Sequence, residues 1–274
     1  MKRSLFPALL FCLGFLSLSA NADERNAYGL GVTYESGIYQ GQDGYTEPYP
    51  FIDANFGDFF IKDKVVGWTG FRHNNISIAL IASYNDYFLD TEDINDASKD
   101  IFVGIENRDR AFEIGFLYTY YSQVGDLTWE YYKDVSDKHG GMHNIVRLAR
   151  PTGNPNLITF TPSIYVHYFS SAFNDYYYGI SASENVNGFE ELKNRAVDPR
   201  PDLTQRQFDE FRPEFEGENS GHLGFDIVIK KPYSQNIVGV FYAAWEEVLA
   251  ETENSSLVED SERLRFRLGL EYKF

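Results

Sequence analysis

The five histidines have the greatest capacity for acid–base chemistry in this chain. They are His73, His139, His143, His167 and His222. Hydrolases that work within a membrane pair a general-base histidine with a serine two residues further along one strand. None of the five is followed by serine at that spacing, and Ser170 and Ser171 are wrongly spaced from His167 for one strand face. A structural, inward-facing histidine is the simpler interpretation at each position.

Proteolysis and metal binding have less support still. Asp226 lies four residues from His222, which is about 13 Å along a strand and too far for a His–Asp couple. His139 and His143 could meet within one loop, but no carboxylate or thiolate accompanies them at ligand spacing. The sequence therefore predicts no catalytic residue, no metal site and no cofactor, and we expect a protein that performs no chemistry.

The last fourteen residues, 261–274, indicate what kind of element holds the polar side chains. One face is charged, and the other is apolar, formed by Leu264, Phe266, Leu268, Leu270, Tyr272 and Phe274. Only a strand places alternate side chains on opposite faces. A membrane-spanning strand needs about 9–11 residues, whereas soluble strands commonly have about 5–6. The segment predicts a transmembrane strand, with Phe274 as the terminal aromatic signal for the barrel-assembly machinery.

The same alternation recurs and predicts an all-β fold, a transmembrane antiparallel β-barrel. Twelve segments qualify, at residues 28–36, 48–56, 58–63, 65–71, 75–84, 111–122, 126–134, 142–151, 157–169, 222–231, 236–248 and 261–274. Bacterial barrels have an even number of strands, with short turns at one end and longer loops at the other. The brief pair between Asp58 and Phe71 leaves an alternative open. It could be one strand, with a compensating strand at Tyr176–Ser181, and ten strands are also possible.

The alternation turns charges of both signs toward the barrel interior, which we call the lumen. The candidate lumen charges are Glu113, Arg147, Asp226, Arg263, Arg265 and Arg267. Mixed signs favour an ion-paired interior over a wide aqueous channel, and porins with an aqueous channel have about 16–18 strands. The arginine row would attract anions if a narrow pore exists. Pairing of that row with Asp226 and Glu113 is the interpretation we favour.

The chain ends and composition predict export. Lys2 and Arg3 precede an apolar run, and Ala20-Asn21-Ala22 has the small-residue cleavage pattern of a signal peptide. We expect residues 1–22 to be removed, leaving one barrel domain at 23–274, a monomer in contact with outer-membrane lipid and lipopolysaccharide. The only cysteine, Cys12, lies in the signal, so no disulfide is expected. A net charge of −17 argues against a nucleic-acid partner.

The long connections are expected outside the cell, because both termini are placed in the periplasm. The longest is acidic around 182–221, and carries Asp209, Glu210, Glu214, Glu216 and Glu218. Carboxylates can bind calcium, but a solvated extracellular loop is the plainer interpretation.

Several motifs, taken in order, resemble the MltA-interacting protein/OmpV family of outer-membrane proteins. They are Tyr28-Gly29-Leu30-Gly31-Val32, Pro48-Tyr49-Pro50-Phe51-Ile52-Asp53, His139-Gly140-Gly141, Tyr178-Gly179-Ile180-Ser181 and Leu268-Gly269-Leu270-Glu271-Tyr272-Lys273-Phe274. The resemblance covers nearly all of the chain beyond the signal and implies a bacterial outer-membrane location.

That resemblance also implies a function. Members are proposed to link a lytic transglycosylase and a murein synthase at the outer membrane, and a channel for small solutes or a surface adhesin are alternatives. Five short periplasmic turns offer less than the roughly 800 Å² per partner of a standard interface, so a weak contact is expected. The residues alone leave scaffold, channel and adhesin open.

Overall fold

The structure is a computed structural model that describes residues 26–248, 252–259 and 261–274. The predicted signal peptide, residues 1–22, lies outside the described residues. Among the described residues, no helix is both long and apolar enough to cross a membrane.

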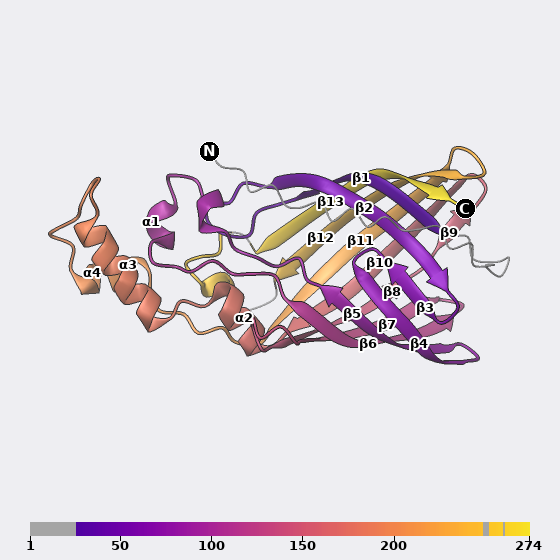
Figure 1. The fold of residues 1–274 in the computed structure, drawn as a ribbon, viewed down its shortest axis with the longest axis horizontal. Helices are drawn as coiled ribbons and strands as arrows, with labels where there is room; N and C mark the ends of the chain where they lie inside the picture. The colour runs from indigo at the N-terminus through magenta and orange to yellow at the C-terminus, as the bar shows by residue number, and fades with distance from the viewer. Residues whose placement is uncertain (1–25, 249–251, 260) are drawn as a thin grey trace.

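One antiparallel sheet closes on itself to form the body of the molecule (Figure 1). Its strands are β1 (Ala27–Glu35), β2 (Tyr45–Phe56), β3 (Phe59–Lys62), β4 (Val65–His73), β5 (Ile76–Tyr84), β6 (Phe112–Ser122), β7 (Gly125–Asp134), β8 (Met142–Ala149), β9 (Thr152–Asn154), β10 (Ile158–Phe169), β11 (Ser220–Pro232), β12 (Ile237–Val248) and β13 (Glu262–Lys273). From β1 to β8 and from β10 to β13 each strand pairs with the next in sequence, β8 pairs with β10, and β13 pairs with β1. The short β9 pairs with β10 and continues β8, so the closed ring has twelve strands.

The twelve segments predicted from alternation are all strands of this ring. The two short segments between Asp58 and Phe71 are separate strands, β3 and β4. The alternative strand at Tyr176–Ser181 is wrong, because α2 (Ser171–Tyr178) occupies its first half and the ring has twelve strands without it. Strand pairing at this site would need a partner edge, and β10 already pairs on both sides.

The outer surface of the barrel is an apolar belt. On β1 and β13 the exposed side chains include Leu30, Val32, Leu268 and Leu270, and their neighbours along each strand are turned inward. Tyr28 and Tyr34 stand at the two ends of the row on β1. This is the pattern of a lipid-facing wall with aromatic residues near both membrane interfaces.

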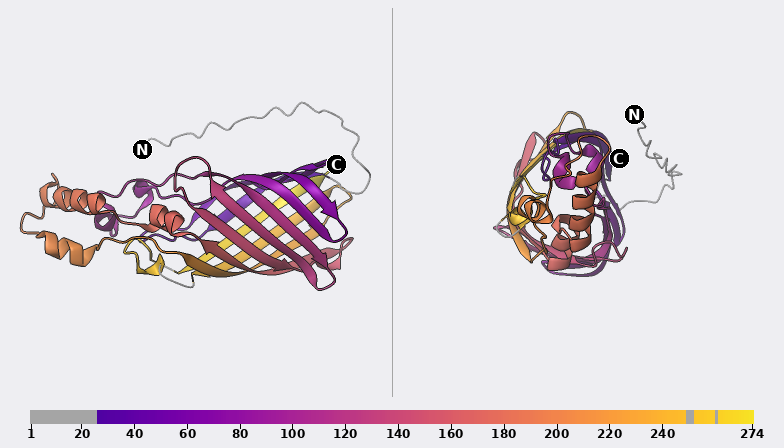
Figure 2. Two further views of the ribbon diagram at one scale, coloured as in Figure 1. Left: turned by 90° about the horizontal axis from the view of Figure 1, so that it is seen from below. Right: turned by 90° about the vertical axis from the view of Figure 1, so that its left-hand side faces the viewer.

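The two ends of the barrel differ (Figures 1 and 2). We call the end with the C-terminus the turn end, because its connections are short turns at 57–58, 74–75, 123–124, 155–157 and 233–236. We call the other the helix end. It carries η1 (Thr91–Asp93), α1 (Lys99–Phe102), α2, α3 (Ala182–Asn194), α4 (Gln205–Phe211) and η2 (Thr252–Asn254). The predicted acidic loop at 182–221 thus contains two helices.

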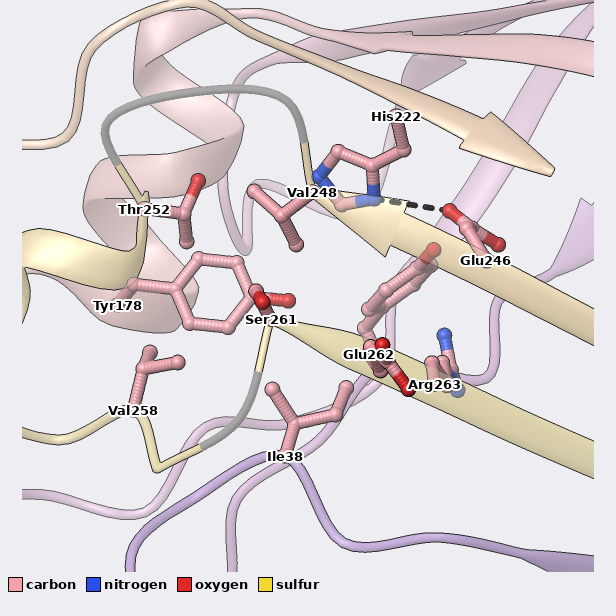
Figure 3. A pocket seen from close by; sticks show the side chains of 11 residues that line it. Ile38, Tyr178, His222, Glu246, Val248, Thr252, Val258, Ser261, Glu262 and Arg263 are labelled. Atoms are coloured by element: carbon pink, nitrogen blue, oxygen red, sulfur yellow. Dashed lines mark hydrogen bonds and ion pairs between the residues drawn. The ribbon is translucent and has the colours of Figure 1, made fainter.

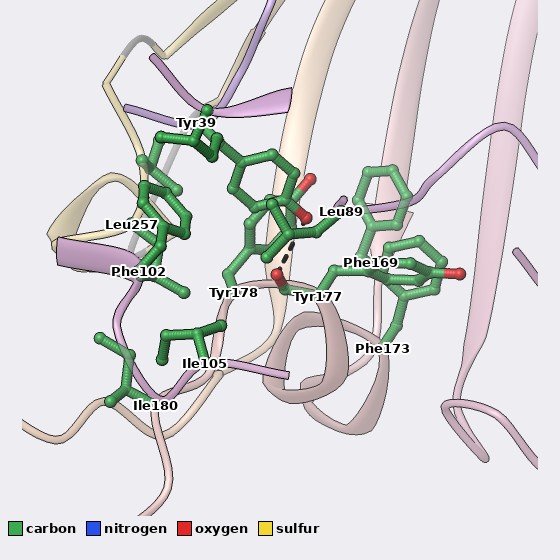
Figure 4. Close-up of a cluster of buried hydrophobic side chains, with 12 residues drawn as sticks. Tyr39, Leu89, Phe102, Ile105, Phe169, Phe173, Tyr177, Tyr178, Ile180 and Leu257 are labelled. Atoms are coloured by element: carbon green, nitrogen blue, oxygen red, sulfur yellow. Dashed lines mark hydrogen bonds between the residues drawn. The ribbon is translucent and has the colours of Figure 1, made fainter. Parts of the chain in front are cut away.

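A hydrophobic cluster closes the barrel at the helix end (Figure 4). Its buried side chains come from four connections and the end of β10, namely Tyr39, Leu89, Ile94, Phe102, Ile105, Phe169, Phe173, Tyr177, Tyr178, Ile180, Leu257 and Val258. The Tyr39 hydroxyl donates to the Tyr177 carbonyl at 2.9 Å, which ties the first connection to α2. Helix α2 is therefore fixed over the lumen by packing from connections far apart in sequence.

The outlying helices are held by buried charges. Arg212, fully buried, donates to the carbonyls of Val103 and Glu184 at 2.5 and 2.8 Å. Arg108 pairs with the Glu184 carboxylate at 2.6 Å. Glu184 also completes a capping box with Ser181 at the start of α3. Burial alone would raise the pKa of the Glu184 carboxyl, but the hydrogen bonds from Ser181 and Arg108 outweigh it and lower the pKa.

This lowered pKa predicts an acid-sensitive helix end. A carboxyl whose pKa falls on folding contributes stability above its unfolded pKa of about 4.3, and the contribution is lost as pH falls through the folded value. We expect hydrogen-exchange protection of α3, corrected for intrinsic rates, to fall below about pH 4. Glu184→Gln should lower protection at pH 7 and remove this acid step. Glu190→Gln, on the exposed face of α3, should leave both unchanged; equal behaviour of the two variants would refute the assignment.

Candidate functional site

A chain of buried histidines and glutamates crosses the lumen beneath α2. His139 Nε2 and His143 Nε2 lie 3.1 and 3.0 Å from the two oxygens of Glu113 on β6. His143 Nδ1 lies 2.9 Å from His167 Nε2, which joins β8 to β10. One carboxylate therefore serves two imidazoles, and a third follows directly.

The chain continues to β11 and β12. His167 Nδ1 lies 3.5 Å from Glu246 Oε1, and His222 Nδ1 lies 2.8 Å from the same oxygen. The Tyr165 hydroxyl donates to the other Glu246 oxygen at 3.2 Å. We call this set the histidine–glutamate chain, consisting of His139, Glu113, His143, His167, Glu246 and His222.

The hydrogen-bond count along the chain fixes its proton arrangement. His139 Nδ1 accepts from the Gly141 N–H at 3.0 Å, so its Nε2 carries the proton donated to Glu113. If neutral His143 donates to Glu113, its Nδ1 accepts the Nε2 proton of His167. His167 Nδ1 then has no proton for Glu246, which agrees with the long 3.5 Å contact. One added proton at that nitrogen would complete every bond in the chain.

Aromatic rings cover the histidine–glutamate chain on the side that faces the helix end. The rings of His167 and Phe169 are 3.9 Å apart, and His139 packs edge-on against Phe173 of α2 at 4.8 Å. Asn174 of the same helix donates to Ser220 Oγ at 2.9 Å. The polar chain is therefore sealed by the hydrophobic cluster above it.

A serine does lie beside one of these histidines, but it precedes the histidine in sequence. Ser220 Oγ is 3.5 Å from His222 Nε2, and Glu246 holds the other ring nitrogen. The order of groups is that of a Ser-His-acid triad. Ser220 is only 2% exposed and lines neither of the two cavities described below. The arrangement is a buried hydrogen-bond network rather than a nucleophile presented to a substrate.

The predicted arginine row on β13 forms a second polar group in the lumen. Arg265 binds Glu35 of β1 through two bonds of 3.1 and 3.0 Å, and Arg263 forms an ion pair with the same carboxylate. Arg267 lies over the rings of Tyr49 and Tyr242, 4.1 and 4.9 Å from their centroids. Within the described residues, no carboxylate lies at ion-pair distance from Arg267.

The pairing expected for this row differs from the observed one. Asp226 on β11 is bound by Ser163 Oγ on the neighbouring β10 and by Arg147 on β8, the next strand beyond it, and Glu113 is bound by histidines. Glu35 is the partner of the arginines instead, because the β1–β13 register places Glu35 opposite Arg265. Strands one or two positions apart in the sheet thus satisfy these lumen charges, rather than pairs across the lumen.

The remaining predicted residue, Phe274, lies at the turn end. Its N–H donates to the Asn26 carbonyl at 3.0 Å, and its exposed ring is 5.5 Å from that of Tyr28. Its role as an assembly signal stays a prediction.

Sequence spacing missed the histidine–glutamate chain. No carboxylate stands at ligand spacing from His139 and His143 in sequence, yet Glu113 reaches both from β6. His143, His167 and His222 lie at inward positions near the same end of three neighbouring strands, which was the available signal. Within the described residues, no group of three or more potential ligands has the geometry of a metal site.

Two adjoining cavities lie at the helix end of the lumen. The first reaches His222 and Glu246 (Figure 3). The second is lined by residues of β1, β2 and the segment after β5. Both are lined by Ile38, Tyr87, Tyr178 and Arg263. The two cavities therefore share part of their lining, with the histidine–glutamate chain on one side and the barrel wall near β2 on the other.

Comparison with known proteins agrees with the fold. The sequence model of the family described as MltA-interacting protein MipA matches residues 28–274. Putative outer membrane protein YiaT of Escherichia coli K12 is 23% identical over 265 residues, 97% of this chain and 96% of that protein. MltA-interacting protein of the same strain is 24% identical over 168 residues, 61% of this chain and 66% of that protein.

Solved outer-membrane barrels are more distant. The COG4313 outer membrane channel from Pseudomonas putida F1 aligns with 93% of this chain and 99% of its own, at 8% identity and a TM-score of 0.39. No functional conclusion rests on that similarity. The barrel and the relatives named as outer-membrane proteins place the chain in the bacterial outer membrane.

The double use of Glu113 predicts a stability effect. Glu113→Gln replaces one acceptor oxygen by an N–H₂ donor, so one buried imidazole N–H loses its partner at a cost of about 1–3 kcal/mol. Urea unfolding in lipid vesicles, followed by tryptophan fluorescence, should show that loss. Glu130→Gln is the control, because the amide oxygen can still accept the Tyr132 hydroxyl. Equal stability of Glu113→Gln and wild type would rule out the shared carboxylate.

Proposed function

The chain belongs to the MltA-interacting protein MipA family, and from this membership we propose that it is a closed outer-membrane barrel that holds a lytic transglycosylase at the membrane. Recruitment of a murein synthase to the same complex is part of this proposal. A relative that is 24% identical over 168 residues bears the name MltA-interacting protein. That name is the observation on which the choice of partner rests.

The filled lumen supports a binding role over a permanently open pore. The histidine–glutamate chain spans strands β6 to β12, and the hydrophobic cluster lies above it. Mutually satisfied charges leave few sites where a hydrated ion would gain free energy. The same filling agrees with a protein that performs no chemistry, as expected for a family of outer-membrane barrels.

The turn end offers a contact surface for a periplasmic partner. Turns exposed to water are usually polar, yet Val124, Leu157 and Tyr233 at three turns are 68%, 66% and 65% exposed. We call these three residues the turn-tip surface. Three apolar tips on a small end fit a weak or transient contact better than a standard interface. This assignment places the turn end in the periplasm and the helix end, including the 182–221 segment, outside the cell.

The turn-tip surface predicts which variants lose the partner. Tyr233→Glu introduces a charge into the apolar contact, so we expect at least about a tenfold loss of a lytic transglycosylase from native envelopes in a detergent pull-down, since about 1.4 kcal/mol corresponds to that factor. Val197→Glu is the matched control, because Val197 is 79% exposed at the helix end and should retain the enzyme. If Val197→Glu alone abolishes retention, the partner binds the opposite end.

A channel is the second candidate, favoured by Arg267, which stacks on tyrosines without an ion-pair partner among the described residues. A binding protein should give no conductance in planar bilayers, whereas a channel should give discrete conductance steps. If steps occur, Arg267→Glu should shift their preference from anions toward cations, and Glu214→Gln, exposed at the helix end, should not. Steps with that behaviour would replace the scaffold proposal.

A further inference from the structure

The barrel wall is incomplete beside the half of β2 that leads to the helix end. Strand β2 has 12 residues, but β3 has only 4 and pairs with Asp53–Phe56. One more bond, from the Asp63 N–H to the Ile52 carbonyl, ends this pairing. From residue 45 to residue 51, the pairings in the described chain join β2 to β1 alone. A sheet edge is therefore left inside an otherwise closed ring.

Two prolines lie on that free edge. Alternate residues of a strand direct their backbone groups to the same neighbour. The Ile52 carbonyl points toward β3, so the backbone nitrogens of Pro48 and Pro50 lie on that same side. Proline has no N–H. The edge therefore lacks two donors that would otherwise be unpaired, which is the usual placement of proline on edge strands.

The free edge lies at the depth of the hydrocarbon. Pro50 pairs with Leu30 and Pro48 pairs with Val32 in the β1–β2 register. Both β1 partners belong to the exposed apolar belt, between Tyr28 and Tyr34. A break in pairing at this depth is unfavourable unless the removed groups are satisfied or absent. The prolines reduce that cost, so the gap is a stable feature of the wall.

Side chains of the segment after β5 cover the gap near the helix end. The rings of Tyr45 and Phe88 meet edge to face at 5.9 Å. Lys64, in the β3–β4 turn, forms an ion pair with Asp86. Arg110 lies over the Phe88 ring, 4.6 Å from its centroid. The cover consists of side chains from a connection rather than of a hydrogen-bonded strand.

The second cavity lies directly behind this cover. Tyr45, Asp86 and Phe88 line it from the wall, and Arg263 and Glu35 line it from the lumen. Arg263 and Arg265 share the single carboxylate of Glu35, and the Arg263 Nε atom is buried without a hydrogen-bond partner. The carboxylates that line the cavity, Glu35 and Asp86, both have cationic partners, and the Arg263 Nε atom remains an unused donor for an anion.

We propose that the gap between β2 and residues 86–88 is a lateral opening through which the lumen takes up a long-chain carboxylate from the leaflet at the helix end. The carboxylate head binds at Arg263 in the second cavity, and the acyl chain leaves the wall past Pro48 and Pro50. Swinging Phe88 away from Tyr45 opens the path. This role goes beyond the scaffold proposal and does not depend on it.

The chemistry of the edge decides between an acyl chain and an added protein strand. Strand addition gains its affinity from backbone hydrogen bonds on the free edge. Pro48 and Pro50 remove donors from that edge, whereas an acyl chain needs none. The unused Arg263 donor beside an open apolar wall favours an amphiphile with an anionic head over a neutral lipid.

Photolabelling of the purified full-length barrel tests the proposal. An oleate analogue with a diazirine in its chain is bound in maltoside micelles, and the labelled residues are mapped by mass spectrometry. We expect saturable label within residues 45–52 and 86–88. Oleate should compete at least about tenfold better than oleyl alcohol, because only the carboxylate can form a charge-assisted hydrogen bond with Arg263. Because oleate and oleyl alcohol differ in the head group, this comparison tests the need for an anionic head without any change to the protein.

Two variants extend the test. Phe88→Ala should raise label in these residues severalfold, and Phe112→Ala, on the exposed belt of β6, should leave it unchanged. Arg263→Gln should weaken oleate competition about tenfold, and its heat-modifiable gel mobility checks that it folds. Label spread evenly over the belt and not competed would show adventitious lipid contact only and would overturn the proposal. So would a dimer cross-linked through the β2 edge.

Discussion

Backbone hydrogen bonding within a lipid bilayer is the constraint on which this structure depends. Each unpaired N–H or C=O in hydrocarbon costs several kcal/mol, so the sheet must return to its first strand. The β1–β13 pairing closes the ring from Ala27 to Glu35. The alternation of apolar and polar side chains along each strand then follows, because the outer face of a closed wall contacts lipid and the inner face does not. The apolar belt and the charged lumen are two consequences of one closure.

The lumen charges of this barrel face away from lipid, and most of them are paired. Strands one or two positions apart in the sheet bring complementary groups together, as with Glu35 and Arg265 on β1 and β13 or Asp226 and Arg147 on β11 and β8. Near the helix end this arrangement changes to imidazoles and carboxylates, whose proton positions are adjustable. The polar interior and the hydrophobic cluster above it together fill the barrel, which makes binding at its surfaces the more natural role than free conduction.

Strand number and facing direction were predictable because they depend on periodicity, which is local. The segment 261–274 alone indicated the fold, and the separate β3 and β4 agreed with it. Partners of the lumen charges were not predictable, because register decides them: Glu35 is the partner of Arg265 only through the seam between the first and last strands. The helices within 182–221 were likewise missed, since Arg212 and other long-range contacts hold that segment.

The seam also has a consequence for how the protein is made. It joins Ala27 to Lys273, so the last pairing links the two extremities of the described chain. Loop-closure entropy and contact order make such a pairing the slowest kind to form by chance. Until it forms, both terminal strands present bare edges that invite aggregation. During assembly, the edges of both terminal strands must therefore be protected at the same time. The factor that protects them can be released only when the last strand has been made and has paired with the first.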